Sequence, residues 1–361
     1  MKQLLTKRSL CASALLLLAA SGVLLASNRT ILTIASTVPA NGDLNPYGVA
    51  LVPTSVGNLQ AGHILVSNFN NAANLQGTGT TIMDIAPNGT ASVFAQISAS
   101  TLPGPCPGGV GLTTALVVLR AGFVIVGSLP TTDGTSATAQ AGCLLVLNST
   151  GAVIETLSDN LINGPWDMTA LDLGATASLF VTNVLNGTVA GNGNLVDEGT
   201  VIRINLSVLT APVPTIQSIT TIGSGFPQRT DPNALVIGPT GVALGQNGTL
   251  YVADSLDNRI AGIPAAVSRT TTDGVGTTVL SGGGLNDPLG LTVIGADILT
   301  VNGNNGLLLD VSTGGAVLGR GLLDNSGMPP GAGALFGLAE GAQGLYFVDD
   351  ATNTLNLLTT N

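Results

Sequence analysis

One pattern recurs about six times along this chain. Its clearest copy begins with a Pro-Thr-Gly turn at 239–241, which leads into an aliphatic run at 242–244. After an Asn-Gly pair typical of hairpins, a second aliphatic run at 250–253 ends in Asp254, and a third run starts at Arg259. The copy therefore predicts consecutive buried strands joined by tight turns.

Two anchor points align the copies. The first is a turn, usually Pro-x-Gly, that enters the first strand of each copy; it stands at 46–48, 109–111, 165–167, 239–241, 288–290 and 335–337. The second is the polar end of the next strand, at Asn68, Ser128, Asn183, Asp254, Asn302 and Asp350. A unit of four strands repeated every 40–50 residues or so is typical of radial sheet arrays. The sequence therefore predicts an all-β fold, a six-bladed β-propeller.

The last copy is one strand short. It contains strand patterns at 345–348 and 354–358, and the chain stops at Asn361. The segment 30–35, which is rich in Thr and Ile, precedes the first Pro-x-Gly turn and belongs to no complete copy. We therefore expect it to form the outermost strand of the last blade, beside the C-terminal strand, so that the two ends of the chain close the ring.

The first 27 residues are typical of a secretory signal peptide. Lys2, Lys7 and Arg8 are basic, the run at 10–25 is almost continuously apolar, and small residues overlap and follow it. An uncleaved membrane anchor is the alternative, although the run is short for a bilayer. We expect residues 1–27 to be removed, a single β-propeller domain to span 28–361, and the protein to be secreted or periplasmic.

Charge limits the partners. Without the predicted signal the chain keeps seven arginines and no lysine against 20 acidic residues, a net charge of −13. Such a surface repels nucleic-acid phosphates and anionic lipids. We therefore expect no nucleic-acid partner and no membrane span after cleavage, and we expect a monomer whose partner is an extracellular or periplasmic protein, peptide or glycan.

Two cysteines remain after cleavage, Cys106 and Cys143. In an oxidising compartment an isolated pair predicts a disulfide, with two buried free thiols as the alternative. His63 is the only histidine, and nothing in the sequence connects it to the cysteines.

Strand polarity places the polar strand ends on the same face as the Pro-x-Gly turns. Another amide or acid follows most of these ends three residues later. Two interpretations are open: a ring of oxygen ligands for Ca²⁺ or a sugar, or side chains that cap their own turns. Regular recurrence favours capping, so departures from the pattern become better candidates for function. Trp166 and Asp167 replace the usual turn residues and, with Asn163, mark the third blade.

Most catalytic templates fail. A Ser-His-Asp triad has only His63 available, and no Gly-x-Ser-x-Gly elbow occurs. Paired carboxylates could come from Asp167, Asp254, Asp287 and Asp350, but their spacing selects no pair.

The segment 239–260 resembles an NHL repeat, whose consensus joins Pro-x-Gly-(Val/Ile)-Ala, Gly-x-(Leu/Ile)-(Tyr/Trp)-Val-(Ala/Thr)-Asp and Asn-x-Arg-(Ile/Val). The resemblance implies a six-bladed propeller of the wider gluconolactonase and NHL group, which includes binding platforms and Ca²⁺-dependent lactonases. In gluconolactonase-like members, carboxylate and amide residues just before the turn glycine help to hold the metal. The matching positions here carry none of these side chains: Tyr47, Val110, Trp166, Thr240, Leu289 and Phe336.

Two functional hypotheses follow. The first is an exported, non-enzymatic binding module that holds a protein, peptide or glycan on the rim, without a cofactor. The second is a Ca²⁺-dependent hydrolase or lyase of the gluconolactonase-like group. The ligand-binding candidates common to this face are Asn68, Asn163, Trp166, Asp167, Asn183, Asp254, Asp287, Asn302 and Asp350.

Overall fold

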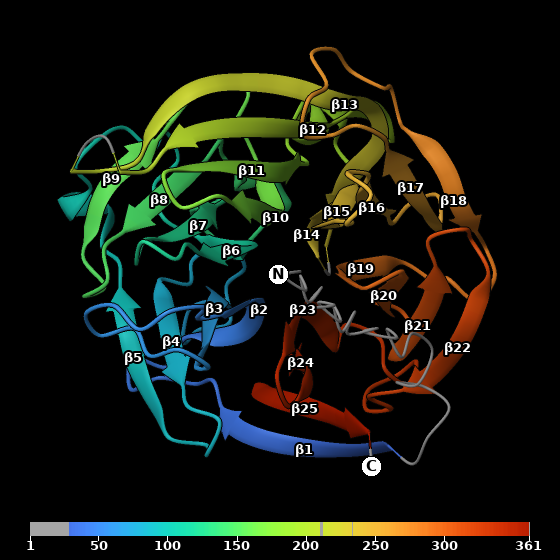
Figure 1. Ribbon diagram of the computed structural model, residues 1–361, viewed down its shortest axis with the longest axis horizontal. Helices are drawn as coiled ribbons and strands as arrows, with labels where there is room; N and C mark the ends of the chain where they lie inside the picture. The colour runs from blue at the N-terminus through green and yellow to red at the C-terminus, as the bar shows by residue number, and fades with distance from the viewer. Residues whose placement is uncertain (1–28, 210–211, 233, 361) are drawn as a thin grey trace, which may run out of the picture.

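The computed structural model describes residues 29–209, 212–232 and 234–360, and the predicted signal peptide lies outside them. Six antiparallel sheets stand radially around a central channel, which confirms the predicted six-bladed β-propeller (Figure 1). We number the blades one to six in chain order, beginning with the sheet that contains β2.

From the channel outward, blade one contains β2 (Leu44–Leu51), β3 (Ile64–Asn70), β4 (Thr81–Ile85) and β5 (Ala91–Gln96). Blade two contains β6 (Leu112–Val118), β7 (Val124–Ser128), β8 (Cys143–Leu147) and β9 (Val153–Leu157). Blade three contains β10 (Pro165–Asp172), β11 (Thr176–Asn183), β12 (Val196–Ser207), β13 (Thr215–Asp231) and the short β14 (Leu235–Ile237).

Blade four contains β15 (Pro239–Leu244), β16 (Leu250–Asp254), β17 (Arg259–Ile263) and β18 (Thr277–Ser281). Blade five contains β19 (Pro288–Ile294), β20 (Asp297–Asn302), β21 (Leu307–Ser312) and β22 (Val317–Leu322). Blade six contains β23 (Leu335–Gly341), β24 (Gly344–Asp349), β25 (Thr354–Thr360) and, outermost, β1 (Arg29–Ser36). Short helical turns are η1 (Ala99–Thr101), η2 (Ser136–Thr138) and α1 (Thr188–Gly191).

The ring is closed by the two ends of the chain, as predicted. Strand β1 pairs antiparallel with β25 in a register that runs from Arg29 opposite Thr360 to Ser36 opposite Thr354. Just beyond β1, the backbone N–H and the hydroxyl of Thr37 both donate to the carbonyl of Asn353, each at 3.0 Å. Closure therefore protects the outer edge of β25, which would otherwise expose unpaired backbone groups.

The Pro-x-Gly turns bring neighbouring blades into close contact at the channel. Gly241 lies near the start of β15, and a Cβ built on it would stand 2.6 Å from the backbone nitrogen of Leu291 in β19. Likewise, a Cβ on Gly48 would stand 2.9 Å from the carbonyl oxygen of Thr114 in β6. The backbone angles of these two glycines are ordinary, so no left-handed conformation requires glycine there. Glycine is needed because adjacent inner strands approach too closely for a Cβ.

Blade three departs from the repeat. Its outer strand β13 is 17 residues long, and it turns back into β14, which lies near the centre of the ring (Figure 1). The residues of β14 pack with side chains from the turns of four inner strands. We call this group the apolar plug; it consists of Tyr47, Trp166, Leu235, Val236, Ile237, Leu289 and Phe336.

Aromatic contacts hold the apolar plug together. The rings of Tyr47 and Phe336 stack with their centroids 3.8 Å apart, and Trp166 lies 6.4 Å from Phe336. Tyr47 also stacks on Phe69 at 4.5 Å. Because these side chains are nearly fully buried, the plug closes the channel at the face where the inner strands begin.

A disulfide joins Cys106, in the loop before β6, to Cys143 at the start of β8, as predicted. It therefore ties the loop before β6 to β8 within the second blade. Within the described residues, no helix has the length and apolar character needed to cross a membrane.

Candidate functional site

The inner strands begin, and their neighbours end, on one face, which we call the upper face. The pairs Pro46–Asn68, Pro165–Asn183 and Pro288–Asn302 lie opposite each other in their sheets. This arrangement confirms the strand polarity inferred from the sequence, so the upper face carries both anchor points of every copy.

The asparagines at the strand ends bond to nearby loop backbone. The side-chain oxygen of Asn183 accepts from the N–H groups of Asn163 and Gly164, each at 3.3 Å. Asn302 accepts from Asn286 at 3.1 Å and donates to the carbonyl of Gly284 at 2.9 Å. Each of these loops directly precedes an inner strand, so the asparagine holds the turn that starts that strand.

Asn68 and Asp254 are also engaged within the protein. The amide of Asn68 donates to the carbonyl of Thr37 at 2.9 Å, which ties blade one to the closing segment. Asp254 forms a buried ion pair with Arg259, whose Nε donates to it at 3.0 Å. Burial raises the pKa of Asp254 to about 6 although Arg259 opposes the shift. The Asp254–Arg259 pair therefore joins β16 to β17 within blade four.

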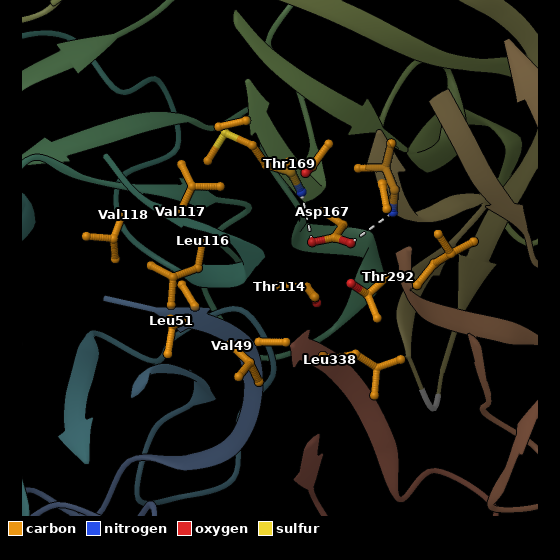
Figure 2. A pocket seen from close by; sticks show the side chains of 18 of the residues that line it. Val49, Leu51, Thr114, Leu116, Val117, Val118, Asp167, Thr169, Thr292 and Leu338 are labelled. Carbon is orange, nitrogen blue, oxygen red and sulfur yellow. Dashed lines mark hydrogen bonds between the residues drawn. The ribbon is translucent and has the colours of Figure 1, made fainter. Parts of the chain in front are cut away.

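Trp166 and Asp167 are neighbours in the sequence, but their side chains point to different places. Trp166 belongs to the plug itself and is 7% exposed. The side chain of Asp167 lies beyond the plug, in the channel toward the lower face (Figure 2). A register shift between Pro165 and Met168 accompanies this change in direction.

Asp287 and Asp350 are brought together by the fold. Both line one cavity of about 710 Å³ on the upper face, which we call the upper cavity. It lies beside the apolar plug, among blades four, five and six and the end of β13. Residues of its lining used below are Arg229, Asp231, Asn258, Asp287, Leu289, Asn304, Met328, Phe336 and Asp350.

Each of these two carboxyl groups has a buried oxygen, Oδ1, that meets no hydrogen-bond partner among the described residues. Burial, with a smaller effect of Asp231, raises the pKa of Asp287 to about 7 while Arg229 opposes it. Burial and the nearby Asp349 raise the pKa of Asp350 to about 7. Buried polar atoms are normally bonded, so each of these two oxygens calls for a donor from a ligand or from water.

The backbone of both residues is fixed. The N–H of Asp287 donates to the side-chain oxygen of Asn258 at 2.6 Å, and its own φ of 59° lies in the left-handed region. The N–H of Asp350 donates to the carbonyl of Ala334 at 2.7 Å. The two carboxyl groups are thus presented by loops whose backbone is held by the protein.

The rest of the upper cavity is of mixed polarity. Arg229 and Asp231 at the end of β13 form an ion pair of 2.9 Å, and Asn258 and Asn304 add amides. Leu289 and Phe336 of the plug supply an apolar floor. A cavity of this size and lining can hold a small polar molecule with one apolar face.

Calcium does not fit the place where the resemblance would put it. Four of the positions before the turn glycines, Tyr47, Trp166, Leu289 and Phe336, fill the channel mouth with hydrocarbon. Calcium requires six to eight oxygen ligands. Over the part of the chain that the structure describes, no group of three His, Cys, Asp or Glu side chains could hold a metal.

Several lining residues were not among the sequence candidates. Arg229, Asp231 and Met328 stand in segments that do not repeat, and Asn258 and Asn304 follow the polar strand ends by a few residues. The recurrence of a second amide or acid near each strand end was a partial signal for the asparagines. No local pattern points to the arginine or the methionine.

No protein-family model matches this chain, and no curated protein matches it in sequence. Among solved structures, a luciferin-regenerating enzyme is 11% identical over 92% of this chain and 95% of its own, with a TM-score of 0.56. Virginiamycin B lyase from Staphylococcus aureus is 12% identical over 92% of this chain and 100% of its own, with a TM-score of 0.53. Regucalcin, a calcium-binding protein from Agrobacterium tumefaciens, is 12% identical over 90% and 94%, with a TM-score of 0.53. At these identities the likeness shows the fold alone, that of the wider propeller group to which the NHL-like repeat pointed.

Proposed function

We propose that this protein is an exported binding module whose upper cavity holds a neutral or cationic polyhydroxylated ligand, such as the end of a glycan. The observation that carries the proposal is the pair Asp287 and Asp350: both residues line the same cavity, and each has a buried oxygen without a hydrogen-bond partner among the described residues. An unpartnered buried acceptor costs about 1–3 kcal/mol, and a ligand that donates to it recovers that cost.

A polyol matches this lining better than an anion does. Hydroxyl groups can donate to the two carboxyls and accept from the amides of Asn258 and Asn304. The C–H face of a sugar ring suits the floor formed by Leu289 and Phe336. The acidic balance of the chain opposes anionic ligands.

Export is part of the same proposal. The segment 1–27 is removed as a signal peptide, and the domain of 28–361 then works outside the cytoplasm as a monomer. The disulfide between Cys106 and Cys143 supports this location, because such bonds persist in oxidising compartments.

A glycan array followed by calorimetry tests the binding function. Trp166, the only tryptophan, provides a second signal, since it contacts Phe336, which lines the cavity. We expect Asp350→Asn and Asp287→Asn to weaken binding about tenfold each. The matched control is Asp197→Asn, which makes the same charge change at an exposed position in blade three. Binding that all three variants leave unchanged would refute the upper cavity as the binding site. A peptide or protein ligand that depends on Asp287 and Asp350 would keep the site and replace the glycan as its ligand.

One observation favours a second function, hydrolysis or elimination. Two carboxyls with pKa values near 7 in one cavity can exchange protons at neutral pH as general acid and base. Acid–base catalysis by these two carboxyl groups would not require a metal ion. Turnover of a panel of lactones, esters and glycosides, abolished by Asp287→Asn and by Asp350→Asn with the folded structure retained, would establish it. Binding without turnover would leave the first function.

A further inference from the structure

The channel below the apolar plug forms a second cavity, separate from the upper one. It has a volume of about 240 Å³ and is lined by the inner strands of all six blades (Figure 2). The plug closes its inner end. Its other end is accessible, because the lining residues Leu51, Val118 and Leu338 are only half-buried. We call this blind cavity the lower channel.

Asp167 is the buried carboxyl group of the lower channel. Its side chain is nearly fully buried, and its two oxygens accept from the N–H of Met168 at 2.8 Å and of Val242 at 3.0 Å. The carboxyl therefore bridges the inner strands of blades three and four. Each oxygen of a carboxylate can accept more than one bond, so both keep capacity toward the channel.

No arginine, lysine or histidine is among the residues that line the lower channel, and the other titratable group there is Asp172 near the outlet. Burial raises the pKa of Asp167 to about 7, because neither the lining nor water compensates its charge fully. A positive group in the channel would meet no repulsion from the lining.

Hydroxyl groups complete the polar side of the lower channel. Thr114 is 4% exposed, and its Oγ1 has no hydrogen-bond partner among the described residues. Figure 2 shows the Thr292 hydroxyl directed toward the Asp167 carboxyl, with Thr114 on the neighbouring wall of the same space, while Val49, Leu116 and Leu338 supply aliphatic walls. Thr114 and Asp167 line the same channel, and a buried hydroxyl without a partner among the described residues favours a ligand with several polar hydrogen-bonding groups there.

We propose that the lower channel binds a small organic cation through a primary ammonium group. The ammonium has three N–H donors, which suit the Asp167 carboxyl and the Thr114 and Thr292 hydroxyls, and its hydrocarbon tail contacts the aliphatic walls. The site stands on residues that the upper cavity does not use, so it is independent of the proposed function.

Calorimetry with n-butylammonium chloride tests the proposal, with n-butanol as the uncharged probe of similar shape. We expect butylammonium to bind at least tenfold more tightly than butanol at pH 8. The decisive variant is Thr114→Val, which removes only a hydroxyl that bonds to nothing within the described protein and should not harm folding. It should weaken butylammonium binding at least threefold.

Thr113→Val is the matched control. Thr113 is equally buried and its Oγ1 is also unpartnered among described residues, but its side chain lies against Gly127 rather than in the lower channel. It should leave binding unchanged, whereas Asp167→Asn should weaken binding at least tenfold if the variant folds. Asp350→Asn should have no effect on this probe, which separates the lower channel from the upper cavity.

Binding should also rise with pH between 5.5 and 8 as Asp167 ionises, because an alkylammonium, like the lysine side chain, keeps its proton there. Asp172 contributes to the same field. Equal affinity for butanol and butylammonium, or loss of binding in Asp350→Asn with Thr114→Val unaffected, would overturn the proposal.

Discussion

Gly241 offers a sharp test of how the blades meet at the channel. In Gly241→Ala the new Cβ would stand 2.6 Å from the Leu291 nitrogen and 2.9 Å from the Gly290 carbonyl carbon, and it would be closer still to the Leu289 oxygen. All three atoms are backbone atoms of blade five, which no side-chain rotation can move. Ordinary contact begins near 3.4 Å, so blades four and five must separate by roughly 1 Å. Overpacking of this kind costs about 3 kcal/mol or more in the free energy of unfolding.

Urea unfolding followed by circular dichroism measures this loss. With a slope of about 3 kcal/mol per molar urea for a chain of this size, the midpoint should fall by about 1 M. The control is Gly314→Ala, an exposed glycine with an ordinary φ whose Cβ would meet only Ser312 Oγ, at 3.7 Å. It should leave stability unchanged or raise it slightly. Equal effects of the two substitutions would refute the close packing of inner strands.

Three further predictions follow. Deletion of 29–36 removes the closing strand, exposes the edge of β25 and should abolish cooperative unfolding; a normal melt would contradict the closure. Replacing Cys106 and Cys143 by Ala removes the bond between two residues that are 37 positions apart. The free energy of unfolding should fall by about 4 kcal/mol in urea titrations, and an unchanged midpoint would show that the disulfide contributes nothing. Because Asp350 has a pKa near 7 when folded and near 4 when unfolded, its contribution to stability is full below pH 4 and is lost as the pH rises to 7. Asp350→Asn should make the free energy of unfolding less dependent on pH between about 4 and 7. A variant whose stability falls with pH as steeply as that of the wild type would refute the raised pKa of Asp350.

The architecture was predictable because the sequence repeats one four-strand pattern. Each copy carries its own turn glycine and alternating buried strands, so the six blades follow from local patterns added along the chain. Ring closure and the disulfide followed from counting, since one strand was missing and two cysteines remained. Closure pairs the two ends of the chain, but the missing strand and the spare cysteine pair are visible in the sequence before any contact is known.

The site was only partly predictable, because it is made by what does not repeat. The plug forms when β14 folds over the channel, and no local signal says where an insertion will lie. Asp287 and Asp350 were candidates, but their meeting in one cavity depends on the placement of three blades. Trp166 and Asp167 formed one candidate pair, yet successive side chains of a strand point to opposite sides, so Trp166 enters the plug and Asp167 the channel below it. Their roles as ligand contacts stay predictions.

A crystal structure of the protein with its tightest glycan-array ligand tests the central claim most directly. We predict ordered ligand density in the upper cavity, with hydroxyl oxygens within hydrogen-bond distance of Oδ1 of both Asp287 and Asp350. Ligand bound on another surface, with these two oxygens bonded to groups of the protein itself, would contradict it.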